Sequence, residues 1–298
     1  MATIPLPLLI AVLRFTGRTR KFRSAADLHR EIAKERRGFS PEPPAAIARS
    51  HAVSREDVLG CPVYTLAPKQ GGSATRVMHL HGGAYVSGIS PFHWRFLAGL
   101  VDATGCTVTI PIYPLAPEAS HREAFPFVTE VYRRLAAVTA PENLVLSGDS
   151  AGGGLALALA QTLPEHHLPQ PRDIVMISPW LEVTARNPGI AAVQPHDPWL
   201  KVPGALEAAR LWAAGEDHQH PRISPINGPV RGLGRLHVWI GQRDILLPDC
   251  RDLRDRCARE GVPLASYTEA PGMIHVWPIL PIRGAHRAAA EIARVVRG

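Results

Sequence analysis

Ser150 lies in a Gly-x-Ser-x-Gly motif, residues 148–152, between a strand-like run at 144–146 and a helix-like run at 153–159. In this setting the motif is typical of a sharp turn that presents the serine hydroxyl as a nucleophile. The flanking glycines leave room for the turn and for close helix–strand packing. A serine hydroxyl is a weak nucleophile, so it needs a base, an acid that orients the base, and donors for an oxyanion. The motif therefore predicts acyl transfer, provided that these groups follow.

Oxyanion donors are predicted in the His-Gly-Gly-Ala loop at 81–84, directly after the strand-like run 76–80. Adjacent glycines let backbone N–H groups converge on one point without a side chain that blocks the substrate. We expect the N–H groups of Gly82, Gly83 and Ala151 to be these donors.

The acid and the base are expected after the serine, in that order, each in a loop beyond a strand. Asp244 follows the strand-like run 236–240, and His275 follows a Pro-Gly turn after the run 264–269. The chain has 14 histidines, so the position of a histidine matters more than its presence. His237 falls inside a strand pattern and His286 on a helix, which makes both weaker candidates for the base.

Asp249 competes with Asp244 for the role of the acid. Asp249 stands at the start of a helix-like run, 250–260, where a carboxylate faces the positive end of the helix dipole. Asp244 is nearer the end of the strand, where the orienting carboxylate should lie. We therefore favour Asp244.

Taken together, these features resemble the hormone-sensitive-lipase-like carboxylesterases, the bacterial family IV, over about residues 76–277. The matching runs are 81–84, 113–118 (Tyr-Pro-Leu-Ala-Pro-Glu), 148–153, 244–246 and 272–275. The resemblance implies an α/β-hydrolase fold with a helical cap. It also implies that Ser150 is the nucleophile, Asp244 the acid and His275 the base, with Gly82, Gly83 and Ala151 as oxyanion donors.

Three positions depart from the family pattern without touching these roles. Ala84 stands where a third glycine is commoner, Pro114 where arginine is usual and Glu182 where aspartate is usual. The change at Pro114 puts in doubt any salt bridge that the arginine would make.

Strand and helix signals alternate along the chain, which predicts an α/β protein with a mainly parallel central sheet covered by helices on both faces. The expected strands lie near 57–66, 76–81, 106–111, 143–147, 173–178, 236–240 and 264–269. We expect residues 1–45 to be an N-terminal cap segment. Residues 46–298 should form the catalytic domain, with 184–223 inserted as part of the cap.

Composition narrows the class without naming a function. Of the 298 residues, 46% are hydrophobic, enough for a buried sheet. Cys250 and Cys257 lie seven apart on a predicted helix, about 10 Å along its axis, which is too far for a disulfide. Reduced cysteines and an apolar run, 4–13, too short to span a bilayer favour a cytoplasmic protein without a signal peptide.

The positive charge is concentrated near the N-terminus. Residues 1–40 hold nine Lys or Arg and three acidic residues, so they carry six of the seven formal net charges. Two explanations remain open, namely peripheral contact with a lipid or membrane surface and cap helices with solvated charged faces. We favour the second. Nucleic-acid binding is not supported, because no aromatic–basic interleaving accompanies the charge.

The sequence thus predicts a serine hydrolase that cleaves short- to medium-chain carboxylic esters through an acyl-enzyme, without a metal or organic cofactor. Two alternatives stay open: an amidase or deacetylase for a specific metabolite, and a non-catalytic ligand-binding protein on a hydrolase fold. His275 argues against the latter. The sequence does not decide whether the chain forms a homodimer, nor which ester is its natural substrate.

Overall fold

A computed structural model describes residues 4–15 and 20–298 of the chain. Of the basic residues in the N-terminal segment, Arg18 and the side chain of Arg14 lie outside this description. No helix in the described ranges is both long and apolar enough to span a bilayer.

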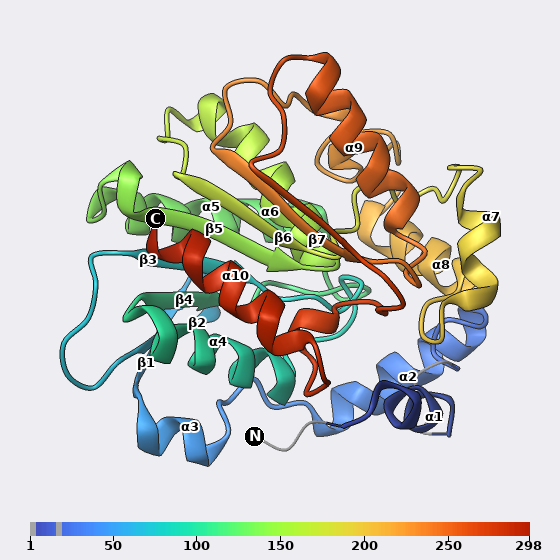
Figure 1. The fold of residues 1–298 in the computed structure, drawn as a ribbon, viewed down its shortest axis with the longest axis horizontal. Coiled ribbons are helices and arrows are strands. Elements are labelled where there is room, and N and C mark those ends of the chain that lie inside the picture. Colours follow the sequence, from blue (N-terminus) through green and yellow to red (C-terminus); the bar gives the residue numbers. More distant parts are fainter. Residues whose placement is uncertain (1–3, 16–19) are drawn as a thin grey trace.

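Eight strands form one mixed sheet in the order β1-β2-β4-β3-β5-β6-β7-β8 (Figure 1). β1 and β2 run antiparallel to their neighbours. The other strands, β4, β3, β5, β6, β7 and β8 in sheet order, are parallel to one another. The bounds are β1 Ala52–Val58, β2 Cys61–Ala67, β3 Arg76–Leu80, β4 Thr107–Pro111, β5 Leu144–Asp149, β6 Asp173–Ile177, β7 Arg235–Gly241 and β8 Ser266–Ala270. The architecture confirms the predicted α/β-hydrolase fold.

One predicted strand, 57–66, is wrong as a single element. The structure has a hairpin there, with Val58 paired to Cys61. Leu59 and Gly60, the two residues between them, both have positive φ, 47° and 79°. Two residues with positive φ are typical of the tight hairpin turn whose twist matches that of the flanking strands.

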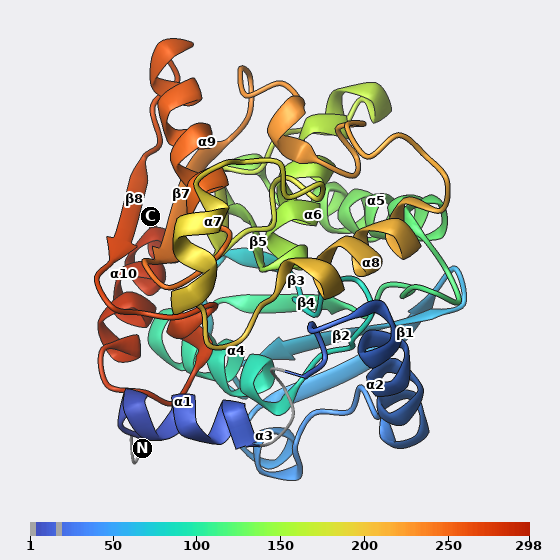
Figure 2. The same ribbon diagram turned by 90° about the vertical axis from the view of Figure 1, so that its right-hand side faces the viewer.

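The helices cover both faces of the sheet (Figures 1 and 2). Their bounds are α1 Leu6–Phe15, α2 Ala25–Gly38, α3 Ala45–Ser50, α4 Pro91–Thr104, α5 His121–Ala137, α6 Ala151–Thr162, α7 Ile190–Val193, α8 Val202–Ala213, α9 Leu247–Arg259 and α10 Ala285–Arg297. Every residue of β5 is buried. Leu146 joins the core beneath α5, α6 and α9, whereas Val145 joins the core beneath α4 and α10. Burial on both faces explains the continuous apolar runs of the parallel strands.

α1, α2, α7 and α8 gather at the side of the molecule toward which β5 and β6 point (Figures 1 and 2). α2 packs against α8, and the carboxylate of Glu207 on α8 lies 2.7 Å from His29 Nε2 on α2. The N–H of Gly204 donates to the carbonyl of Phe22 at 2.9 Å. A Cβ at Gly204 would collide with the backbone of Phe22, so this close approach requires glycine. The N-terminal segment and the 184–223 insertion are therefore packed on each other.

Candidate active site

Ser150 lies at the apex of the turn between β5 and α6. Its backbone has φ 53° and ψ −123°, a conformation that is strained for a residue with a side chain. Its N–H donates to the carbonyl of Ile177 at 2.8 Å, which holds the apex against β6. A Cβ at Gly148 would collide with the carbonyl of Gly152, and a Cβ at Gly152 with that of Leu80. The turn therefore needs glycine at both positions.

The side chains of Ser150, His275 and Asp244 form one hydrogen-bonded chain. His275 Nε2 lies 2.9 Å from Ser150 Oγ, and His275 Nδ1 lies 2.8 Å from Asp244 Oδ2. An ionised carboxylate can only accept, so Nδ1 carries the proton and donates to Asp244. Nε2 then accepts from the serine hydroxyl, which is the tautomer that a general base needs.

This chain is shielded from solvent, with exposed fractions of 8% for Ser150, 4% for His275 and 0% for Asp244. Burial alone would lower the pKa of His275. The charge and hydrogen bond of Asp244, together with the charge of Asp197, outweigh burial and raise this pKa above its ordinary value. A raised pKa makes the imidazole a stronger proton acceptor, which is the property that a general base requires.

The other residues considered for acid and base have different surroundings. Asp249 lies in the first turn of α9 and accepts a hydrogen bond from Asn187 Nδ2 at 2.9 Å. Burial raises the pKa of Asp249 to about 7. His237 Nε2 lies 3.0 Å from Asp173 Oδ1 within the sheet, and His286 is exposed on α10. Asp249 and His237 are therefore bonded to other side chains, and His286 faces solvent.

Gly82 and Gly83 line the cavity that holds the serine, but their N–H groups differ. The N–H of Gly82 donates to Asp149 Oδ1 at 2.9 Å and is therefore not free for an oxyanion. This differs from the expectation that Gly82 is one of the oxyanion donors. Gly83 has φ 134°, which favours glycine. Ala151 is the first residue of α6, where N–H groups have no partner within the helix. The N–H groups of Gly83 and Ala151 therefore remain as candidate donors.

Asp149, inside the Gly-x-Ser-x-Gly motif, holds the loop that contains Gly82, a role that the sequence pattern did not indicate. His93 Nε2 lies 3.2 Å from its Oδ2, and His79 Nε2 lies 3.4 Å from its Oδ1. Since His93 Nδ1 accepts the N–H of Ser90 at 3.0 Å, its proton is on Nε2 and points to Asp149. Burial alone would raise the pKa of Asp149, but His93 and His79 hold it well below its usual range. An anionic Asp149 thus fastens the Gly82 loop.

A cavity of about 720 Å³ has Ser150 and His275 in its wall. Its apolar lining residues are Phe22, Phe39, Ala84, Ile89, Phe92, Trp199, Leu200, Val276, Ile279 and Leu280. The Trp199 ring stands edge-on to the His275 ring, with centroids 5.8 Å apart. Trp212, by contrast, is fully buried and stacks on Tyr85 at 4.0 Å. Within residues 184–223, Trp199 therefore lines this cavity and Trp212 belongs to the hydrophobic core.

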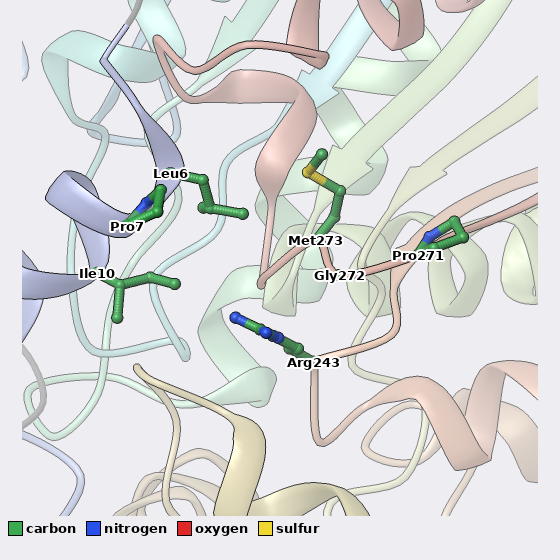
Figure 3. A pocket seen from close by; sticks show the side chains of 7 residues that line it. All are labelled: Leu6, Pro7, Ile10, Arg243, Pro271, Gly272 and Met273. Atoms are coloured by element: carbon green, nitrogen blue, oxygen red, sulfur yellow. The ribbon is translucent and has the colours of Figure 1, made fainter.

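A separate groove of about 470 Å³ lies between α1 and the loops that carry Asp244 and His275 (Figure 3). It is lined by Leu6, Pro7, Ile10, Arg243, Pro271, Gly272 and Met273. The N–H of Arg243 donates to the carbonyl of Met273 at 2.9 Å, which joins the two loops. Ser150 and His275 line the larger cavity and not this groove.

The structure shows the contacts around two of the departures from the family pattern, Pro114 and Glu182. In the stretch that contains Pro114, Glu118 pairs with Arg36 of α2, whose Nε and Nη2 each lie 3.1 Å from a carboxylate oxygen. Glu182 accepts the N–H of Thr184 at 2.8 Å and so stabilises the turn after it. The glutamate thus acts as a local backbone acceptor.

Comparisons with known proteins agree with this geometry. A family model described as alpha/beta hydrolase fold, Abhydrolase_3, matches residues 77–279. An acetyl-hydrolase from Streptomyces hygroscopicus is 33% identical over 222 residues, 73% of each chain. The crystal structure of an esterase from the bacterial hormone-sensitive lipase family has a TM-score of 0.84 and 28% identity, covering 100% of this chain and 99% of the other.

A crystal of the esterase EstE5 soaked with p-nitrophenyl butyrate gives a similar result, with a TM-score of 0.82 and 26% identity over 97% of both chains. The two structural matches extend over nearly the whole chain, and together with the family model they confirm the resemblance that the motifs indicated. The chain therefore belongs to the hormone-sensitive-lipase-like α/β hydrolases and is a carboxylesterase of that family.

Proposed function

We propose that the chain hydrolyses short- to medium-chain carboxylic esters through an acyl-enzyme on Ser150, with His275 as base and Asp244 as acid. The observation that carries this proposal is the hydrogen-bonded chain of the three side chains, at 2.9 and 2.8 Å, with Ser150 and His275 in the wall of a partly apolar cavity. A nucleophile, its base and an orienting carboxylate in this geometry are suited to acyl transfer.

In the first step Ser150 Oγ attacks the ester carbonyl carbon while its proton moves to His275 Nε2. The carbonyl electrons move onto oxygen, and the N–H groups of Gly83 and Ala151 stabilise the oxyanion. The intermediate collapses, the carbon–oxygen bond to the alcohol breaks, and His275 protonates the departing alcohol. Water then attacks the acyl-enzyme with His275 as base, which releases the acid and restores the Ser150 hydroxyl.

The acyl preference is supported by the named relatives and by the cavity. The Streptomyces relative is an acetyl-hydrolase, and p-nitrophenyl butyrate was soaked into the similar structure of EstE5. The apolar lining accepts a hydrocarbon chain and excludes water from the intermediate. We expect kcat/KM to be highest between acetate and octanoate in a p-nitrophenyl ester series extending to palmitate. A maximum at palmitate would contradict this preference.

We assign a cap to two segments, residues 1–45 and the 184–223 insertion. Support comes from the packing of α2 on α8 and from the residues that both segments contribute to the cavity, Phe22 and Phe39 from the first and Trp199 and Leu200 from the second. A cap built in this way would set the length and shape of the acyl group that fits.

The Streptomyces acetyl-hydrolase also favours a second candidate, an amidase or deacetylase that removes an acetyl group from one specific metabolite. The same machinery would serve, so the difference lies in the leaving group. Rates on matched acetate esters and acetamides separate the two activities. A higher rate on the amide would favour the second candidate.

Replacement Ser150→Ala tests the mechanism. We expect p-nitrophenyl butyrate hydrolysis to fall by roughly 10⁴-fold or more, because the nucleophile is lost. A fluorophosphonate should label the wild type once, and mass spectrometry should place the adduct on Ser150. Ser147→Ala is the matched control, since Ser147 is buried on β5, the strand that leads to Ser150, and its hydroxyl lies 3.1 Å from His79 Nδ1. Near-normal hydrolysis by a folded Ser150→Ala variant would exclude the mechanism.

A further inference from the structure

Asp197 is a buried carboxylate that the mechanism above does not use. It lies in the 184–223 insertion, between the short α7 region and α8, and is only 2% exposed. A carboxylate with so little solvent requires hydrogen-bond donors from the protein.

Three backbone N–H groups supply these donors, and they come from two distant parts of the chain. Oδ1 accepts from Trp199 at 2.7 Å and from Leu200 at 2.8 Å. Oδ2 accepts from Ile245 at 3.0 Å. One side chain therefore ties the insertion to the loop that follows β7.

Both ends of this tie lead to catalytic groups. Ile245 is the residue after Asp244, and the N–H of Leu246 donates to Asp244 Oδ1 at 3.0 Å. At the other end, the turn held by Oδ1 places the Trp199 ring edge-on to His275, with centroids 5.8 Å apart. Asp197 thus holds the loop of the acid and an aromatic wall against the base.

The charges around Asp197 and His275 can be named on each side. Asp244, Asp197 and Asp149 act on His275. On the insertion itself, the Lys201 ammonium bonds the main-chain carbonyls of Asp197 and Gln194 at 2.9 and 3.1 Å rather than the carboxylate, and His196 next to Asp197 is exposed.

The carboxylate of Asp197 is anionic above about pH 6. Burial, followed by the charge of Asp244, raises its pKa to about 6, while the N–H groups of Trp199 and Ile245, and then the charge of His275, oppose the shift. Above that pH its negative charge faces the imidazole from within a shielded site, where screening by salt is weak. The charge therefore favours the imidazolium of His275.

We propose that Asp197 is a positioning residue of ester hydrolysis, which fastens the insertion to the Asp244 loop and adds a second negative charge behind His275. The inference rests on the proposed function of the three catalytic groups. A residue that only capped a turn would hold Trp199 and Leu200. It would have no need to reach Ile245, and its charge would not act on the base.

Replacement Asp197→Asn removes the charge with little change in size. Its amide oxygen can still accept from the Trp199 turn, but its NH₂ then faces the Ile245 N–H. We expect kcat for p-nitrophenyl butyrate to fall at least tenfold. We also expect the acid limb of kcat/KM to move to lower pH by roughly one unit, because an anion beside the imidazole is lost.

Asp249→Asn is the matched control, since Asp249 is equally buried at 2% exposed and is held by Asn187. It should leave the acid limb in place. Asp197→Glu keeps the charge, so it should keep the acid limb near the wild-type pH even where its longer side chain lowers kcat.

An NMR titration of the His275 ring reads the same shift without turnover. Its pKa should fall in Asp197→Asn and stay near the wild-type value in Asp249→Asn and Asp197→Glu. An unchanged His275 pKa in folded Asp197→Asn would overturn the inference. Wild-type protein that titrates as expected but neither hydrolyses esters nor takes up a fluorophosphonate on Ser150 would instead refute the proposed function.

Discussion

Replacement Asp244→Asn changes one atom in a fully buried side chain and bears directly on the state of the base. Asp244 accepts two hydrogen bonds, one from His275 Nδ1 at 2.8 Å and one from the N–H of Leu246 at 3.0 Å. Asparagine offers one acceptor oxygen and one NH₂ group. The backbone N–H of Leu246 can only donate and needs an acceptor. The asparagine oxygen should therefore face Leu246, and its NH₂ should face His275.

A donor opposite Nδ1 favours the tautomer with the proton on Nε2. That nitrogen lies 2.9 Å from Ser150 Oγ, where an N–H can no longer accept the hydroxyl proton. Loss of the correct tautomer lowers kcat by about 10⁴-fold in a serine protease with the same three groups. The same loss here corresponds to about 5.5 kcal/mol of transition-state stabilisation.

The assay is hydrolysis of p-nitrophenyl butyrate at pH 8, with folding checked by circular dichroism and thermal unfolding. Asp249→Asn is the control, because Asp249 is also a buried aspartate within the same segment but is bonded to Asn187. The control should keep its rate within a few-fold. A larger loss in Asp249→Asn than in Asp244→Asn would mean that the acid has been misassigned.

Three further predictions concern backbone space, proton affinity and stability. Gly82→Ala should lower kcat by roughly 10²–10³-fold, because the new Cβ would collide with the Asp149 carboxylate and displace the oxyanion loop; unchanged kcat would contradict the close packing. The half-maximum of kcat/KM on the acid side should lie above pH 6.5, since the pKa of His275 is raised from that value and the base must be neutral; a pH titration reads it directly, and a lower half-maximum would refute the electrostatic argument. Asp249 has a pKa of about 7 in the folded chain against about 3.9 when unfolded. Between these two pH values only the folded state holds the proton, so the free energy of unfolding of the wild type falls as pH rises. Asp249→Asn removes this titration and should abolish up to about 4 kcal/mol of the decrease. Denaturant unfolding at pH 4 and pH 8 measures the difference.

Local patterns predicted the fold well where each element is decided by its own residues. The parallel strands are buried on both faces, so they read as apolar runs such as 144–146. The hairpin at Leu59–Gly60 was missed because β1 is largely exposed and offers no apolar run of its own. Its turn depends on backbone conformation at two residues, which the surrounding pattern does not reveal.

Ser150, Asp244 and His275 could be proposed from the sequence because each stands in the turn or loop that follows a strand, and the strands of a parallel sheet end at one edge. The roles of Gly82 and Asp197 depend instead on which partner each group meets across the fold. The Gly82 N–H is taken by Asp149, 67 residues away, and the Asp197 carboxylate reaches Ile245, 48 residues away. Neither the Asp-Pro dipeptide at 197–198 nor the glycine at 82 carries a sequence signal that would predict such a partner. A hydrogen bond of this kind requires a donor and an acceptor that only the folded chain brings within 3 Å, so supporting residues around a catalytic group stay hidden when the catalytic group itself is evident.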